Sequence, residues 1–231
     1  MTDSSRDQIL ARIAASLGRD PAATGTTASA AASSAYAQLP RDYRAASVID
    51  APSASMSASS SASIAALFAD RLHEYNAACT PVASEAAIAE AVAASLTARS
   101  LSSLAVVSGI PPQWLPTGFD FASAEPLSAV ELDRQPGILT ACSVAIAETG
   151  SLVLQSGPRQ GLRLHTLVPD FHLCVVFERQ LVATVPEAFH RLTPDLPTTF
   201  ISGPSATADI EMTRIKGVHG PRSLHVLLVA D

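Results

Sequence analysis

The segment LCVVFERQLVATVPEAFHRLTPDLPTTFI, residues 173–201, carries the pattern that most directly predicts the fold. It begins with Leu173 to Phe177, a nearly continuous apolar run that is typical of a parallel strand covered on both faces. It ends on a second β-rich run, Thr199 to Ile201. Between the two runs, Thr184 to Glu187 has the spacing of a helix-starting capping box. The segment therefore predicts a strand–helix–strand unit.

The same alternation continues along much of the chain. Further β-rich runs lie at residues 104–107, 152–154 and 224–229, and apolar residues at helical spacing lie at 64–75 and 88–96. Strands that alternate with helices are typical of layered α/β proteins, in which the connections cross over with a right hand. We expect an α/β fold, specifically a three-layer α/β/α sandwich.

The N-terminal quarter of the chain has a different composition. Ile9, Ile13 and Leu17 recur at helical spacing, so residues 1–20 are expected to form an amphipathic helical arm. Residues 21–62 are rich in Ala, Ser and Thr and hold few large apolar side chains, which is typical of a linker. The main domain is then expected to span residues 63–231.

Charge and hydropathy exclude several functional classes. The chain has 231 residues, with 15 basic and 21 acidic side chains and a net charge of -6, and it has no basic run, which argues against nucleic-acid binding. The longest aliphatic run, Val226 to Ala230, is far shorter than the ~20 residues of a membrane span. The N-terminus lacks the apolar core of a secretory signal. These features predict a cytoplasmic protein.

The cysteines do not form a metal-binding pattern. Cys79, Cys142 and Cys174 are far apart in sequence and none belongs to a CxxC motif. Iron–sulfur clusters need closely spaced thiolates, so we expect no cluster, no other cofactor and no metal site in this chain. The cysteines are expected to be reduced core thiols, and redox chemistry would require partner proteins or an added cofactor.

The turn Ser202–Ser205 is the first candidate ligand site. Gly203 permits a close backbone approach, and the predicted helix Thr207–Ile215 follows with Asp209 and Glu211 near its first turn. A strand-to-helix loop at the carboxyl edge of a parallel sheet is where open α/β folds bind ligands, and helix-start amides attract anions. The alternative is that the loop only turns the chain.

His219 and Glu148 are the candidate catalytic residues. His219 lies between Gly217 and Gly220 and would titrate near neutral pH, although a lone His is more often a structural hydrogen-bonding group. Glu148 begins a polar turn between two apolar runs and is a candidate nucleophile, general base or hydrogen-bond anchor.

Two arginines and a histidine lie in the segment that connects the apolar run 152–154 to the strand expected at 173–177. Arg159 and Arg163 could hold a carboxylate if their guanidinium groups face inward, and could equally face solvent. His172 ends that connection just before the strand Leu173 to Phe177; it is expected to be half-buried, with a structural use favoured over catalysis.

Four motifs together resemble the LUD-domain family. The resemblance is to those family members that occur together with two iron–sulfur proteins. They are AIAETGSLVL from Ala145, LVPDFHLCVV from Leu167, ISGPSATADIE from Ile201 and GVHGP from Gly217. The resemblance implies a fold like that of the NagB, ribose-5-phosphate isomerase and CoA-transferase group. It also implies a role in oxidising L-lactate to pyruvate, with the electron-carrying clusters held by iron–sulfur partner subunits.

The resemblance also implies a cleft that would hold a small anion such as lactate or pyruvate. Carried over by motif, its proposed lining comprises Glu148, Thr149, Gly150, Gly203, Pro204, Ser205, Thr207, Asp209, Glu211 and His219. Arg159 and Gly220 are further candidate ligand-binding residues, which come from their local sequence and not from the resemblance. The chain would then be a non-redox component of a lactate-oxidising complex rather than a complete enzyme. The alternatives are a CoA-transferase-like enzyme in which Glu148 attacks an acyl thioester, and a scaffold without a ligand.

Overall fold

The computed structural model describes residues 5–18, 34–40, 58–207, 215–216 and 220–230. The chain divides into two compact units, residues 1–43 and 44–231. The first contains helix α1 (Ser5–Ser16), whose Ile9, Leu10 and Ile13 are at least half exposed, and a helical turn at residues 34–37. The linker expected at residues 21–62 is described only at 34–40 and from residue 58 on. The division into an arm, a linker and a domain remains our proposal.

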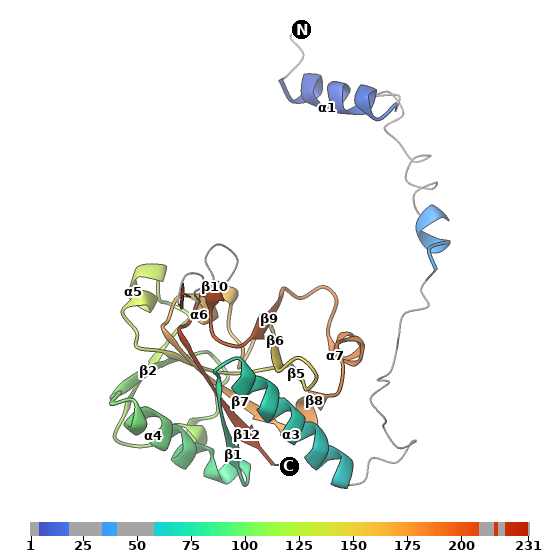
Figure 1. Cartoon of the computed structure of the whole chain (residues 1–231). Coiled ribbons are helices and arrows are strands. Elements are labelled where there is room, and N and C mark those ends of the chain that lie inside the picture. Colours follow the sequence, from blue (N-terminus) through green and yellow to red (C-terminus); the bar gives the residue numbers. More distant parts are fainter. Residues whose placement is uncertain (1–4, 19–33, 41–57, 208–214, 217–219, 231) are drawn as a thin grey trace. The chain divides into compact units, whose positions relative to one another are not determined.

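A six-stranded parallel sheet forms the centre of the second unit (Figure 1). Its strand order is β1-β12-β7-β4-β2-β3, so the last strand of the chain pairs with the first. Strand β7 is buried along its whole length, which explains its continuous apolar sequence. The strands are β1 (Ala78–Val82), β2 (Ser103–Val106), β3 (Asp120–Ser123), β4 (Ile138–Ala141), β7 (Phe171–Phe177) and β12 (Ser223–Val229).

A second, four-stranded sheet has the order β8-β5-β6-β9. Strand β6 is antiparallel to both β5 and β9, and β5 is parallel to β8. The predicted strand–helix–strand order along residues 173–201 is present, but β7 belongs to the first sheet and β9 to the second. Residues 173–201 therefore do not form a strand–helix–strand crossover within a single sheet. The strands are β5 (Val144–Ile146), β6 (Ser151–Gln155), β8 (Leu181–Val182) and β9 (Thr198–Ser202).

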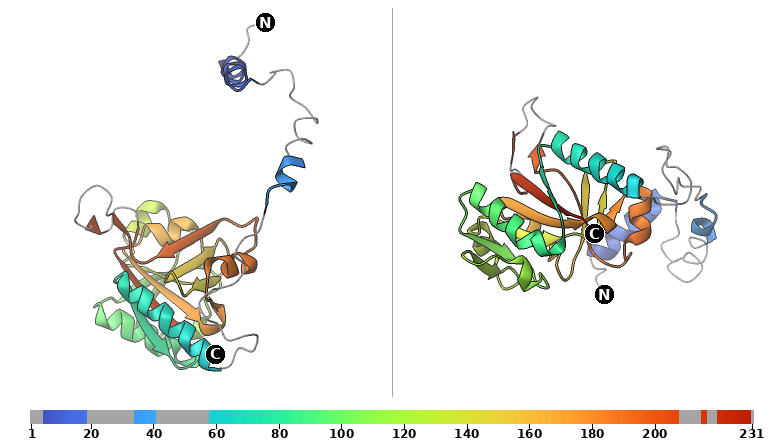
Figure 2. Two further views of the ribbon diagram at one scale, coloured as in Figure 1. Left: turned by 45° about the vertical axis from the view of Figure 1, so that its right-hand side comes forward. Right: turned by 90° about the horizontal axis from the view of Figure 1, so that it is seen from below.

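Both faces of the parallel sheet are covered. Leu173 and Val175 of β7 join one core cluster with helix α4 (Ile88–Ala98), and Cys174 and Val176 join another with helix α3 (Ala58–Glu74). The second cluster also includes residues of β5 and β6, so α3 and the small sheet share that face (Figure 2). A third cluster packs helix α7 (Val185–Arg191) on the small sheet. The predicted α/β fold is confirmed. One of the two layers that cover the parallel sheet contains the four-stranded sheet in addition to helix α3.

Short helices complete the second unit. They are α5 (Ala129–Asp133), α6 (Arg163–Leu167) and the 3-10 turns η1 (Glu85–Ala87), η2 (Pro112–Trp114) and η3 (Glu178–Gln180). No helix within the described ranges is long and apolar enough to cross a membrane.

The predicted helix from Thr207 to Ile215 is wrong at both ends. Strands β10 (Ala206–Thr207) and β11 (Ile215–Lys216) pair antiparallel, with Thr207 opposite Ile215. Thr and Ile are β-branched and favour strands over helices, which agrees with this pairing. Asp209 and Glu211, placed by the prediction in the helix, fall at residues 208–214 and lie outside the described residues, as does His219.

Candidate functional site

A pocket of about 350 Å³ opens beside strand β9. His172 and Leu224, the second residues of β7 and β12, contribute to its wall, so it lies at the amino ends of these parallel strands. The loop after β9 was expected at the carboxyl edge of the parallel sheet, and this placement is wrong because β9 belongs to the other sheet, where it is antiparallel to β6. The lining residues are Arg163, Thr166, Leu167, His172, Thr199, Phe200, Ile201, Ser202, Gly203, Pro204, Ser205, Gly220, Pro221 and Leu224.

The loop after β9 forms one wall and is held on two sides. Gly203 is buried with φ +80°, and a Cβ built on it would lie 2.5 Å from the Cβ of Tyr75 just beyond α3. Only glycine combines this backbone angle with this close approach. The N–H of Ser205 donates to the carbonyl of Pro221 at 2.9 Å. This bond joins the loop to the Gly220–Pro221 bend, so two of the predicted ligand segments do meet at the pocket.

The turn at Glu148 lies next to the same loop. Ser151 and Ser202 are register partners in β6 and β9, and their hydroxyl oxygens are 2.6 Å apart. Gly150, with φ +58°, also abuts α3, because its Cβ would lie 2.8 Å from the Cβ of Arg71. The two turns therefore lie side by side against the carboxyl end of α3. Glu148, Thr149 and Gly150 are nevertheless not among the residues that line the pocket.

Glu148 holds the start of helix α7. Its Oε1 accepts a hydrogen bond from the N–H of Val185 at 3.0 Å, and its own N–H donates to the carbonyl of Ala183 at 3.1 Å. The predicted capping box is wrong: Thr184 makes no capping hydrogen bond, and Glu187 accepts from the N–H of Ala183. Of the three roles considered for Glu148, the structure displays the hydrogen-bond anchor.

Arg163 rather than Arg159 lines the pocket. Arg159 has φ +67°, its N–H donates to the carbonyl of Ser108 and its carbonyl accepts from Ala141, both at 2.6 Å. Arg163 is the first residue of α6, and the start of that helix is fixed because His165 Nδ1 accepts the N–H of Leu162 at 3.1 Å. Among the described lining residues Arg163 is the one charged side chain, and none is acidic.

His172 lines the pocket, although sequence reasoning favoured a structural use over catalysis for it. Its side chain is 1% exposed rather than half-buried, and Nε2 lies 2.7 Å from the hydroxyl of Thr140. Nδ1 is buried and has no hydrogen-bond partner among the residues that the structure describes. Burial lowers the pKa of His172 to about 4, so the imidazole is neutral at pH 7. No sequence signal distinguishes this histidine from a fully bonded core residue.

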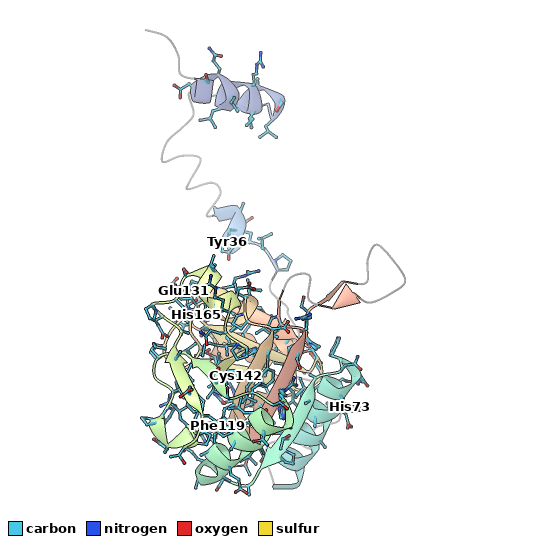
Figure 3. All side chains as sticks on the ribbon, turned by 90° about the vertical axis from the view of Figure 1, so that its left-hand side faces the viewer. Tyr36, His73, Phe119, Glu131, Cys142 and His165 are labelled. Carbon is cyan, nitrogen blue, oxygen red and sulfur yellow. The ribbon has the colours of Figure 1, made fainter. Side chains whose placement is uncertain are left out.

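The cysteines are free thiols, as expected. Cys142 and Cys174 are buried, and Cys142 lies within the folded domain (Figure 3). Burial raises the pKa of Cys79 to about 11, so its thiol is protonated at neutral pH. Within residues 58–207 and the other described ranges, no three His, Cys, Asp or Glu side chains are grouped so as to hold a metal ion.

Comparison with known proteins identifies relatives of this architecture. The LUD domain family matches residues 132–229. Lactate utilization protein C of Deinococcus radiodurans is 45% identical over 167 residues, which cover 70% of this chain and 77% of that protein. A protein of the same name from Shouchella clausii is 36% identical over 100 residues, covering 40% of this chain and 43% of that protein.

A solved structure agrees with these matches. The crystal structure of a DUF162 family protein from Deinococcus radiodurans is 39% identical and superposes with a TM-score of 0.63. The match covers 73% of this chain and 98% of that one. By the extent of these matches, this chain belongs to the LUD domain family.

Proposed function

We propose that this chain takes part in lactate utilization, as a non-redox component that acts with iron–sulfur partner proteins in the oxidation of L-lactate to pyruvate. The 45% identity to a protein named lactate utilization protein C, over most of both chains, supports the role in lactate utilization. The wide separation of the three cysteines in sequence supports the assignment of electron transfer to partners.

The proposed contribution of this chain is to bind a small carboxylic acid in the β9 pocket. The observation that carries this proposal is the lining itself, in which the guanidinium of Arg163 is the one charge and no described lining residue is acidic. Guanidinium groups bind carboxylates bidentately, and Leu167, Ile201 and Leu224 offer apolar surface to a short carbon chain.

The Asp170–Arg222 ion pair lies just outside this lining, before β7 and β12. Both oxygens of the Asp170 carboxylate accept hydrogen bonds from the Arg222 guanidinium, one of them at 2.6 Å. Arg222 is therefore already paired with an anion of the protein, and among the described lining residues Arg163 is the cation that could bind a ligand.

A thioester-based transferase is less well supported. Its nucleophile would be Glu148, whose carboxylate accepts the Val185 N–H and does not line the pocket. A nucleophile must be able to reach the substrate, and no specific observation favours that reaction over acid binding.

The test of the cellular role is growth on L-lactate as sole carbon source. A strain that lacks this chain should fail to grow on L-lactate yet grow normally on pyruvate, because the proposed defect precedes pyruvate. The wild-type chain should restore growth and Arg163→Gln should not, whereas Arg159→Gln should restore it, since Arg159 does not line the pocket. Copurification of iron–sulfur proteins with the tagged chain would support the partner assignment. Undiminished growth of the deletion strain on L-lactate, in an organism without a second lactate-oxidising system, would refute the role.

A further inference from the structure

Strand β9 lies at an open edge of the four-stranded sheet. The sheet has the order β8-β5-β6-β9, and no described strand pairs with β9 on the side away from β6. None of the five residues of β9 is buried, whereas all five residues of β6 are buried. An edge strand presents unpaired N–H and C=O groups, with which a strand of another chain can pair.

The register shows which backbone groups of β9 are free. The carbonyl of Val153 in β6 accepts the N–H of Ser143 at 2.9 Å, so Val153 directs its backbone groups toward β5. Its register partner in β9 is Phe200. Because these directions alternate along an antiparallel strand, residues 199 and 201 bond to β6. Phe200 and Ser202 therefore direct their N–H and C=O groups to the open side.

The other edges of the two larger sheets have features that discourage such pairing. Strand β8 has only two residues, β1 contains Pro81, and β3 begins with Asp120. Short strands, prolines and charged side chains are the usual protection of a sheet edge. Strand β9 has the sequence TTFIS over five residues, with neither a charge nor a proline. Within these two sheets of the described chain, β9 is the unprotected edge.

The two faces beside this edge differ in chemistry. On one face, the ring centroids of Phe200 and Phe189 are 5.8 Å apart, and the two residues are 44% and 59% exposed. On the opposite face, Ile201 packs on the core cluster that includes Leu224 of the pocket wall. Arg163 is the one charged side chain among the described residues of that wall. A strand added to β9 would place alternate side chains against an apolar pair and near a cation.

We propose that β9 is a docking edge for a partner protein, which adds an extended segment as a fifth strand and directs an acidic side chain to Arg163. In such recognition, main-chain hydrogen bonds give affinity and sites for alternate side chains give specificity. The cation and the lack of acids in the described lining favour an acidic segment, and the exposed aromatic pair favours apolar residues at the alternate positions. This inference goes beyond the proposed small-acid binding and does not depend on it. Since both ligands would use Arg163, they would exclude each other.

The probe is the acetylated and amidated hexapeptide Thr-Val-Glu-Val-Thr-Val, added to the full chain in a calorimetric titration. Its valines would lie on the face of Phe200 and its glutamate on the face of the pocket. N-methylation of the valines should abolish binding if the added strand is antiparallel, and N-methylation of the glutamate and the last threonine should abolish it if the strand is parallel. In either case the other methylated peptide should still bind. Equal affinities of the two methylated peptides would overturn the proposal.

Side-chain recognition is tested with the same peptide in which glutamine replaces glutamate. The wild type should bind the glutamate peptide about tenfold more tightly, Arg163→Gln should bind the two alike, and Arg159→Gln should keep the preference. Phe189→Ser should weaken both peptides about two- to tenfold, whereas Val130→Ser, at a 63% exposed position of α5, should not. An undiminished preference in Arg163→Gln, or no binding of the glutamate peptide by the wild type, would overturn the proposal.

Amide hydrogen exchange of the wild type provides a test without variants. The amides of Thr199 and Ile201, which bond to β6, should exchange slowly with or without the glutamate peptide. Those of Phe200 and Ser202 should exchange fast in the free protein and slowly at saturating peptide. Unchanged exchange at Phe200 and Ser202 would refute the added strand. Slow exchange at both in the free protein, lost on dilution, would show that a second copy of the chain covers this edge and would also overturn the proposal.

Competition separates this inference from the proposed function. Displacement of the glutamate peptide by L-lactate would support both. Peptide binding that L-lactate does not affect would leave the docking edge standing and contradict small-acid binding at Arg163. Binding of L-lactate that Arg163→Gln weakens, without any binding of the peptide, would do the reverse.

Discussion

Gly203→Ala should destabilise the domain for two reasons. Alanine would have to adopt a backbone angle that favours glycine, and its Cβ would clash with Tyr75. An L-residue at φ +80° costs about 1–2 kcal/mol. The added Cβ would also lie 2.5 Å from Tyr75 Cβ, well inside van der Waals contact, and such overpacking costs about 1–3 kcal/mol more. Gly118→Ala is the matched control, since Gly118 has φ +87° with nothing within 4 Å of its added Cβ. We expect losses of about 2–5 kcal/mol for Gly203→Ala and about 1–2 kcal/mol for Gly118→Ala.

Urea unfolding followed by tryptophan fluorescence measures both changes. The chain contains one tryptophan, Trp114, which is fully buried in the domain core and so reports on its unfolding. Tyr75→Gly removes the atom that the new Cβ would meet. In that background Gly203→Ala should cost no more than Gly118→Ala does, giving a coupling energy of about 1–3 kcal/mol. Equal costs of Gly203→Ala and Gly118→Ala in the wild-type background would refute the close approach of the loop to Tyr75.

Two further predictions concern the stability of the fold. Glu148→Ala should lower the free energy of unfolding by about 1–3 kcal/mol, because the partly buried Val185 N–H loses its acceptor. Glu148→Gln keeps an amide oxygen and should cost much less, and equal losses in urea unfolding would contradict the anchoring role. Burial lowers the pKa of His172 from 6.5 to about 4. Burial, and after it the charge of Arg99, lowers the pKa of His225 to the same value. Both histidines are therefore neutral in the folded protein above pH 6.5, and the free energy of unfolding should fall as the pH falls from 6.5 toward 4, where the unfolded chain binds more protons. His172 alone should account for about 3 kcal/mol between pH 7.5 and pH 4, and a His172→Gln protein should show a smaller difference. A free energy of unfolding that is independent of pH over this interval would contradict the lowered pKa values of both imidazoles.

Strands with both faces covered were predictable from sequence, because burial on two sides leaves an unbroken apolar run. Strands β7 and β12 lie within two residues of the predicted runs at either end. The short strands β4 and β5 were not predicted, since their three or four residues carry too little periodicity and are separated by only two residues. The existence of a second sheet depends on the pairing of β6 with β9 across more than forty residues, which no local pattern encodes.

The candidate site was predictable by segment and not by side chain. The Gly203 loop and the Gly220 bend do meet, as the sequence suggested for two glycine-bearing bends at strand ends. Which of Arg159 and Arg163 lines the pocket is decided by a few residues of loop geometry around Gly157 and Gly161, which form an isolated bridge. Among the described residues Nδ1 of His172 has no hydrogen-bond partner, and this depends on tertiary packing that no local sequence pattern encodes.

The central claim is that the β9 pocket binds a small carboxylic acid through Arg163. Its most direct test is calorimetric titration of the full-length chain with L-lactate, in the wild type and in the two single-arginine variants Arg159→Gln and Arg163→Gln. The claim predicts saturable, one-site binding that Arg159→Gln preserves and Arg163→Gln weakens at least about tenfold, the value of one charge-assisted hydrogen bond. Undiminished binding by Arg163→Gln, or no saturable binding by the wild type, would contradict it.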